Sequence, residues 1–142
     1  MELKRGEIYY IKFPYTADPK FPDGKSKFVL VLQEGEYFKR YNMVEILLIT
    51  SDQRHKNKPE YITNVLIEQG TTKLESESWA QCAQPYPVPK ALFEQKDVWC
   101  AGCLSADKMD EIDAALYFGL SMGLQRQLTF DTDAAAVDEK EI

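Results

Sequence analysis

The sequence predicts a mainly β domain with one long helix, built as a small curled sheet or barrel of five or six short antiparallel strands. Three observations support this fold class. Short runs rich in aromatic and β-branched residues alternate with turn signals through most of the chain. A single segment near the C-terminus has apolar residues at helical spacing. The length of 142 residues is that of one ordinary domain, and 44% hydrophobic with 28% charged residues excludes a disordered chain.

The first three strands are expected in the N-terminal part of the chain. Aromatic and β-branched residues over 6–13 predict the first strand, and three prolines and a glycine in 14–26 predict a long exposed loop after it. The second strand is expected over 27–33, where a continuous apolar run indicates that both faces are covered. The third strand, over 43–50, follows a hairpin connection around residues 34–36.

Later segments complete the sheet. Residues 51–59 are polar and basic, which predicts a second long loop. The proline-spaced segment 85–89 is expected to end the fifth strand, and Pro89 opens a short helix that runs to Glu94. The three remaining strands are expected over residues 61–67, 78–84 and 97–104.

The long helix begins after Ser105, an expected N-cap, with Asp107 in its first turn. Apolar residues at three-to-four-residue spacing carry it to about Gly123: Leu104, Met109, Ile112, Leu116, Leu120 and Leu124. We therefore expect one domain over residues 1–124 and a mobile acidic tail over residues 125–142.

The sequence also indicates a compartment and excludes several kinds of site. No apolar run approaches the ~18 residues of a membrane helix, and no signal peptide opens the chain, so we expect a cytoplasmic protein with no membrane partner. Cys100 and Cys103 have the spacing of a redox motif but follow strands rather than a βαβ unit, so we expect them to pack in the core on opposite faces of their strand. A zinc site from these residues with Cys82 and His55 would lack paired-ligand spacing, so neither metal nor cofactor is expected.

The charge distribution leaves two interpretations open. The net charge of −6 argues against a nucleic-acid partner. However, residues 1–60 contain 11 Lys and Arg against 9 Asp and Glu, whereas residues 61–142 contain 6 against 14. The basic residues of the first part fall mostly in expected loops, where they either form a cationic face or are scattered solubilising charges.

Five blocks of sequence, in order and spacing, resemble the MazF/PemK toxin family of type II toxin–antitoxin systems over residues 4–124. The blocks are Arg5–Tyr9, Gly24–Leu32, Ile49–Ser51, Ser78–Pro85 and Gly102–Asp113. The resemblance implies an SH3-like barrel of the PemK/CcdB kind, with five to seven strands and a long C-terminal helix. It also implies a homodimer that cleaves single-stranded RNA without metal, leaving a 2′,3′-cyclic phosphate, and a small antitoxin partner with an acidic disordered tail.

Such cleavage needs a base for the 2′-hydroxyl, an acid for the leaving oxygen and cations for the phosphorane. The family's catalytic arginine, in an Arg-Pro pair, falls on Lys27 followed by Phe28, so the charge is kept but the bidentate guanidinium is lost. The family's hydroxyl residue at the end of the third strand matches Thr50. An arginine and an aspartate found in one branch fall on Gln81 and Ala83.

The candidate catalytic residues are therefore Lys27, Thr50 and His55, the last because histidine is the side chain whose ordinary pKa lies near neutrality. Each has a plainer interpretation, as a strand-edge lysine, a strand threonine and a solvated loop histidine. Aromatic and polar groups that would hold RNA are Tyr15, Phe21, Lys25, Ser51, Arg54, Lys56 and Gln81. Tyr15 and Phe21 would equally serve to anchor their loop to the domain.

Two function hypotheses follow, with a weaker third. The first is an endoribonuclease toxin whose RNA cleft lies between the loops 14–26 and 51–59, with Lys27 and Thr50 close together. The second is a catalytically degenerate module on the same scaffold that binds nucleic acid, an antitoxin or another protein without cleavage; Gln81 and Ala83 favour it. The third is a relative of the gyrase-poisoning toxins that share this barrel.

Overall fold

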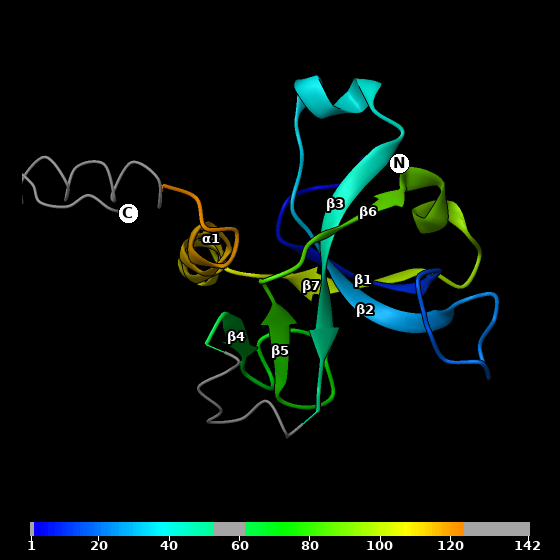
Figure 1. The fold of residues 1–142 in the computed structure, drawn as a ribbon, viewed down its shortest axis with the longest axis horizontal. Coiled ribbons are helices and arrows are strands. Elements are labelled where there is room, and N and C mark those ends of the chain that lie inside the picture. Colours follow the sequence, from blue (N-terminus) through cyan, green and yellow to red (C-terminus); the bar gives the residue numbers. More distant parts are fainter. Residues whose placement is uncertain (1, 53–61, 124–142) are drawn as a thin grey trace, which may run out of the picture.

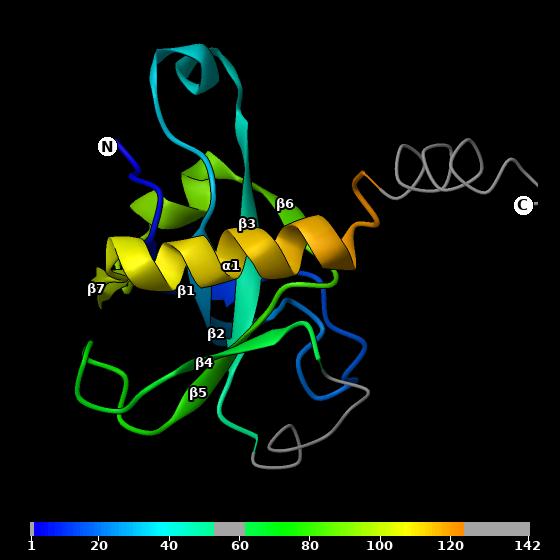
Figure 2. The same ribbon diagram turned by 90° about the vertical axis from the view of Figure 1, so that its left-hand side faces the viewer.

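The computed structural model describes residues 2–52 and 62–123. Its seven strands pair only in antiparallel fashion, in the order β4-β5-β3-β2-β1-β7, with β6 paired to β3 beside β5. The strands are β1 (Glu7–Phe13), β2 (Lys25–Val31), β3 (Met43–Thr50), β4 (Asn64–Ile67), β5 (Ser78–Gln81), β6 (Tyr86–Pro89) and β7 (Trp99–Cys103). The sheet curls, and α1 (Ala106–Gly119), the one α-helix within the described residues, lies across it (Figures 1 and 2). The predicted fold class is confirmed.

Both faces of the sheet are covered, as the apolar run of the second strand predicted. Leu30 belongs to a core cluster that includes Met109 and Ile112 of α1, whereas Val29 and Val31 belong to a second cluster on the other face. The second cluster is closed by Phe93 of the 3-10 helix η4 (Lys90–Glu94), the short helix expected after Pro89. Val29, Leu30 and Val31 are all fully buried, so the second half of β2 lies at the centre of the domain.

The sequence predicts only that residues 85–89 end the fifth strand, but residues Tyr86–Pro89 form a strand of their own, β6. The strand β5 ends at Gln81 rather than at residue 84. Val88 pairs with Val44 of β3, and the next backbone amide, that of Lys90, donates to the Asn42 carbonyl at 2.8 Å. The backbone amides of the even-numbered residues in this segment therefore point toward β3. The prolines, which have no amide hydrogen to donate, occupy the odd-numbered positions, where the amide would point away from β3. An edge strand tolerates proline in this arrangement.

The connection between β2 and β3 is more than a simple hairpin. It contains a 3-10 helix, η1 (Glu36–Arg40), and it projects from the body of the sheet at the top of Figure 1. Lys90 of η4 donates to the Phe38 carbonyl, which ties this projection to the domain.

The helix α1 begins as predicted but ends earlier. The Ser105 hydroxyl accepts a hydrogen bond from the Lys108 amide at 3.1 Å, which confirms the N-cap. The helix ends at Gly119 rather than near residue 123: Leu120 is its C-cap, and Ser121 has a positive φ of 58° that does not continue the helix. The end of the helix approaches the chain closely, since a Cβ on Gly119 would lie 3.2 Å from the Cys82 carbonyl oxygen. No helix in the described ranges has the length and apolar character needed to cross a membrane. The expected tail over residues 125–142 lies outside the described residues.

The cysteines of β7 differ from expectation. Cys100 and Cys103 are exposed rather than packed in the core, and they lie opposite Tyr9 and Glu7 of β1. A bulge at Ala101, which is fully buried, shifts the register, so the two cysteines share a face of the sheet instead of alternating. Only Cys82 is buried, and within the described part of the chain no group of histidine, cysteine or carboxylate residues is arranged to hold a metal.

Candidate functional site

The pairing of β2 and β3 ends at one point, and a cavity opens there. The last pair is Phe28↔Ile49, so Lys27 and Thr50 are the residues directly beyond it. Both line a cavity of about 540 Å³, which we call the fork cavity. Its lining consists of residues 26–28, 49–51 and 73–76 with Tyr10, Ser78 and Trp99. This volume lies in the range of roughly 300–1,000 Å³ that small-molecule sites have.

One wall of the fork cavity is the connection between β4 and β5. Leu74 of this connection is buried, and the backbone amide of Lys73 donates to the Ala101 carbonyl in β7 at 2.8 Å. The Ser78 hydroxyl donates to the Ser76 carbonyl at 2.9 Å. These contacts fix the wall against both β5 and β7, so the cavity is preformed.

The floor of the fork cavity contains a row of three aromatic rings, which we call the aromatic row. Tyr10 of β1 lies opposite Phe28 of β2 on one side and opposite Trp99 of β7 on the other. Their ring centroids lie 4.8 Å apart for Tyr10 and Phe28, 5.8 Å for Tyr10 and Trp99, and 5.6 Å for Phe28 and Trp99. Trp99 is 42% exposed, so the row reaches the surface.

The polar groups of the cavity favour an anionic ligand. Lys27 and Lys73 supply two cations and Glu75 one carboxylate. Among the described residues, neither lysine takes part in an ion pair. The Thr50 hydroxyl oxygen accepts a hydrogen bond from the Asp52 amide at 3.2 Å, which orients the hydroxyl while its own proton remains a donor.

The structure brings only part of the predicted site together. Lys27, Thr50 and Ser51 line the fork cavity. Gln81 does not line it: this half-buried residue pairs with Asn64 on the far side of β5. His55, Arg54 and Lys56 lie outside the described residues.

The long loop after β1 also lies apart from the cavity lining. The Tyr15 ring packs edge-on against Phe13 with centroids 5.4 Å apart, as expected for a residue that anchors its loop. The Lys25 ammonium lies over the Phe21 ring, 5.1 Å from its centroid. Tyr15 and Phe21 of the loop, and Lys25 at the start of β2, therefore contact one another or the sheet, and none of them lines the fork cavity.

The residues that sequence reasoning missed are Tyr10, Trp99 and Lys73. Tyr10 and Phe28 occupy facing positions of adjacent strands, but the register that pairs them is set by the turn and loop geometry. The position of Trp99 opposite Tyr10 depends on a bulge in β7 that could not be predicted from the sequence. The signal available in the sequence is a tryptophan near the start of the strand expected over residues 97–104.

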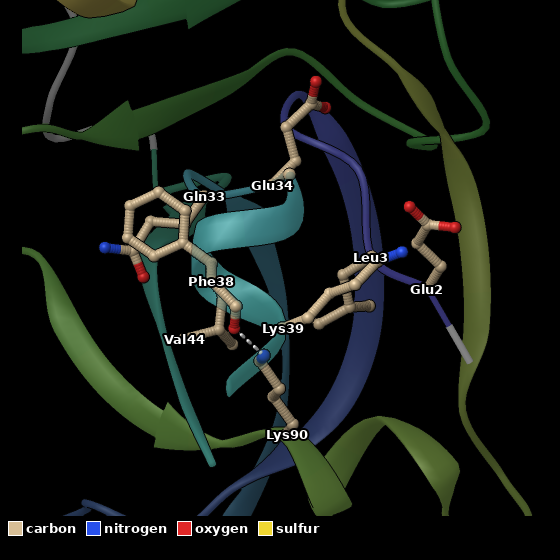
Figure 3. A pocket seen from close by; sticks show the side chains of 9 residues that line it. Glu2, Leu3, Gln33, Glu34, Phe38, Lys39, Val44 and Lys90 are labelled. Carbon is tan, nitrogen blue, oxygen red and sulfur yellow. Dashed lines mark hydrogen bonds between the residues drawn. The ribbon is translucent and has the colours of Figure 1, made fainter. Parts of the chain in front are cut away.

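A second cavity, of about 370 Å³, lies between the N-terminal segment, η1 and η4. Figure 3 shows Lys90 reaching the Phe38 carbonyl within it. Two of its other charged groups are also engaged: Glu34 accepts from the Arg5 amide at 2.6 Å, and Lys39 pairs with Glu36 at 2.6 Å. The residues around this cavity therefore attach η1 to the rest of the domain. The fork cavity is the better candidate site.

Comparisons with known proteins give a family and a fold. A sequence model described as "PemK-like, MazF-like toxin of type II toxin-antitoxin system" matches residues 4–119. No curated protein matches the chain.

Solved structures of similar fold are numerous. The toxin MazF-mt6 of Mycobacterium tuberculosis is 17% identical over 81% of this chain and 96% of its own, with a TM-score of 0.58. A MazE–MazF structure from Deinococcus radiodurans is 16% identical over 86% and 98% of the two chains, with a TM-score of 0.63. An endoribonuclease from a mycobacterial species, in complex with its cognate antitoxin, is 15% identical over 84% and 94%, with a TM-score of 0.58.

Proposed function

Because the chain belongs to the family of PemK-like, MazF-like toxins of type II toxin–antitoxin systems, we propose that it is a metal-independent endoribonuclease whose active site is the fork cavity. The substrate is single-stranded RNA. The ribose 2′-oxygen bonds to the adjacent phosphorus while the bond from phosphorus to the 5′-oxygen breaks. A base takes the 2′-hydroxyl proton and an acid protonates the leaving oxygen, which gives a 2′,3′-cyclic phosphate and a 5′-hydroxyl.

The observation that carries this proposal is that Lys27 and Thr50 both lie directly beyond the last pair of β2 and β3 and both line one cavity. Lys27 stabilises the negative charge that develops on the phosphorane, as a point charge rather than a bidentate clamp. The Thr50 hydroxyl donates to a phosphate oxygen and so orients it. Ser51 borders the same phosphate, and His55 is the candidate acid or base.

The natural partner we propose is a small antitoxin whose acidic, disordered tail covers the cations of the fork cavity. The support is that structural neighbours include a MazE–MazF structure and an endoribonuclease bound to its cognate antitoxin. We further propose that the toxin is a cytoplasmic homodimer, and that Arg54 and Lys56 add cations to its RNA groove.

A second candidate function is a binding module on the same scaffold that does not cleave. Lysine in place of the family's arginine at Lys27 favours it, because lysine cannot make two parallel hydrogen bonds to a phosphate. Ala83 also favours it: its Cα lies against the end of α1, 3.1 Å from the position of a Cβ on Gly119, so this position serves helix packing.

Product analysis separates the two candidates. Wild type, Lys27→Ala and Lys27→Arg are each incubated with a mixed-sequence RNA in the presence of a chelator, and the product ends are identified by mass spectrometry. We expect cyclic-phosphate ends from wild type and Lys27→Arg but not from Lys27→Ala. Lys39→Ala is the matched control, because Lys39 lies in η1 at the other end of β3. Intact RNA after incubation with folded wild type would favour the binding module.

A further inference from the structure

The aromatic row is a continuous feature of one face of the sheet. Residues directly opposite each other in antiparallel strands point to the same face, so Trp99, Tyr10 and Phe28 form one line across β7, β1 and β2. The next residue in this line, Ile49 of β3, is buried in the core cluster beneath α1. The line therefore runs from the hydrophobic core outward to the surface.

The outer end of the row is exposed to solvent, although the other tryptophan of the chain is buried. Trp99 is 42% exposed, whereas Trp79 in β5 is only 6% exposed. Tyr10 and Phe28 are half-buried beneath the same cavity. A large ring held at a surface by two others offers a flat apolar face without the entropy loss of ordering a mobile side chain.

The groups around the row are suited to a nucleotide rather than to an apolar ligand. Lys27 lines the same cavity as the row, and Lys73 belongs to the connection between β4 and β5 that forms one wall of this cavity. Ser26 and Ser76 add polar residues to the lining of the cavity. A ring face framed by cations is the arrangement in which a base stacks while the neighbouring phosphate is held by charge.

We propose that the aromatic row is a stacking platform for an unpaired nucleobase of single-stranded RNA, with Trp99 as the principal contact. This inference rests on the proposed function, since it assigns the base that flanks the phosphate held at Lys27. The platform replaces Tyr15 and Phe21 as the aromatic residues that bind RNA. Because every base has a π-face, the platform adds affinity for RNA whose bases are unstacked and discriminates little between one base and another.

Binding is measured with an uncleavable probe, a single-stranded 2′-O-methyl RNA of mixed sequence carrying a fluorescent label, by anisotropy at fixed salt. We expect Trp99→Ala to weaken binding roughly 5- to 150-fold, the range found for removing one base-stacking aromatic. Trp99→Leu keeps apolar bulk but has no π-face, so it should weaken binding comparably, whereas Trp99→Phe should retain most of the affinity. Circular dichroism and thermal unfolding establish that each variant is folded.

Intrinsic fluorescence gives an independent readout. The exposed Trp99 should be quenched by the unlabelled probe, and Trp99→Phe should abolish the quenching even though Trp79 remains. A duplex of the same sequence should quench much less, because its bases are already stacked.

Two results would overturn the platform, and a third would uphold it while removing the nuclease proposal. One is a folded Trp99→Leu variant that binds the single strand as tightly as wild type; if this variant also cleaves RNA like wild type, the nuclease proposal stands while the platform fails. Another is quenching of Trp99 by a short oligoglutamate peptide but not by the nucleic acid, which would assign the row to an acidic protein partner. Wild type that binds and is quenched but does not cleave ribo-oligonucleotides would retain the platform and remove the nuclease.

Discussion

Replacing Lys27 and Thr50 separately and together tests whether the two side chains act on one phosphate. Both residues lie directly beyond the last pair of β2 and β3. Facing residues at such a position have Cβ atoms about 4.5–5.5 Å apart, or somewhat more where strands begin to separate. This separation is below the roughly 7–10 Å beyond which the effects of two mutations simply add. We therefore expect the two substitutions to be coupled.

The expected losses follow from the roles assigned. Removing a group aimed at the developing charge lowers kcat by about 10²–10³, so Lys27→Ala should fall in that range. Thr50→Val removes a hydrogen bond to a charged group, worth about 1.5–3 kcal/mol, or roughly 10- to 150-fold. Independent sites would multiply these losses in the double variant. A shared phosphate predicts that the double variant is at least ~5-fold more active than that product, a coupling of about 1 kcal/mol.

The assay is single-turnover cleavage of a fluorogenic single-stranded RNA in the presence of a chelator. Lys27→Ala combined with Lys39→Ala is the control, because the eight residues of β3 place about 23 Å between its two ends. That pair should be additive within about 0.3–0.5 kcal/mol. Strict additivity of the Lys27 and Thr50 substitutions would refute the shared phosphate, and undiminished cleavage by either single variant would remove that residue from the site.

Two further predictions concern the framework of the site. Ile112→Ala, at a fully buried position of α1, should lower the free energy of unfolding by about 2–5 kcal/mol in a urea titration. Phe118 is 67% exposed on the same helix, so Phe118→Ser should change this free energy by less than about 0.5 kcal/mol. Equal effects of the two substitutions would contradict the packing of α1 on the sheet through Ile112. Burial raises the pKa of the Cys82 thiol to about 12, so the thiol stays protonated in the folded chain at pH values where it ionises in the unfolded chain. The destabilisation caused by Cys82→Ala should therefore shrink between about pH 9 and pH 12, as measured by denaturation at each pH, and a destabilisation that is constant over this range would show that the buried thiol does not resist ionisation.

The strands that the sequence predicts well are those whose composition agrees with their tertiary environment. The run Val29–Val31 is apolar at every position, and it is buried on both faces between two core clusters. The segment Tyr86–Pro89 shows the opposite case, because its prolines indicate a turn while pairing with β3 makes it a strand. Pairing with β3 outweighs the local preference of the segment for a turn, and the local sequence gives no sign of this pairing.

The candidate site divides in the same way. Lys27 and Thr50 could be predicted to meet because the expected second strand begins at Lys27 and the expected third strand ends at Thr50, and both residues line one cavity in the structure. The aromatic row could not be predicted, because it depends on the register of three strands and on the bulge at Ala101 that brings Trp99 opposite Tyr10. Register is a property of pairing, and a one-residue slip would move Trp99 to the other face.

The most direct test of where RNA binds is a nuclear magnetic resonance titration of the isotope-labelled chain with the uncleavable 2′-O-methyl oligonucleotide. Binding at the fork cavity predicts that the largest amide shifts fall on residues 26–28, 49–51 and 73–78, together with the indole of Trp99. Shifts concentrated on η1 or on the end of α1, with those segments and the Trp99 indole unmoved, would contradict the assignment of the site.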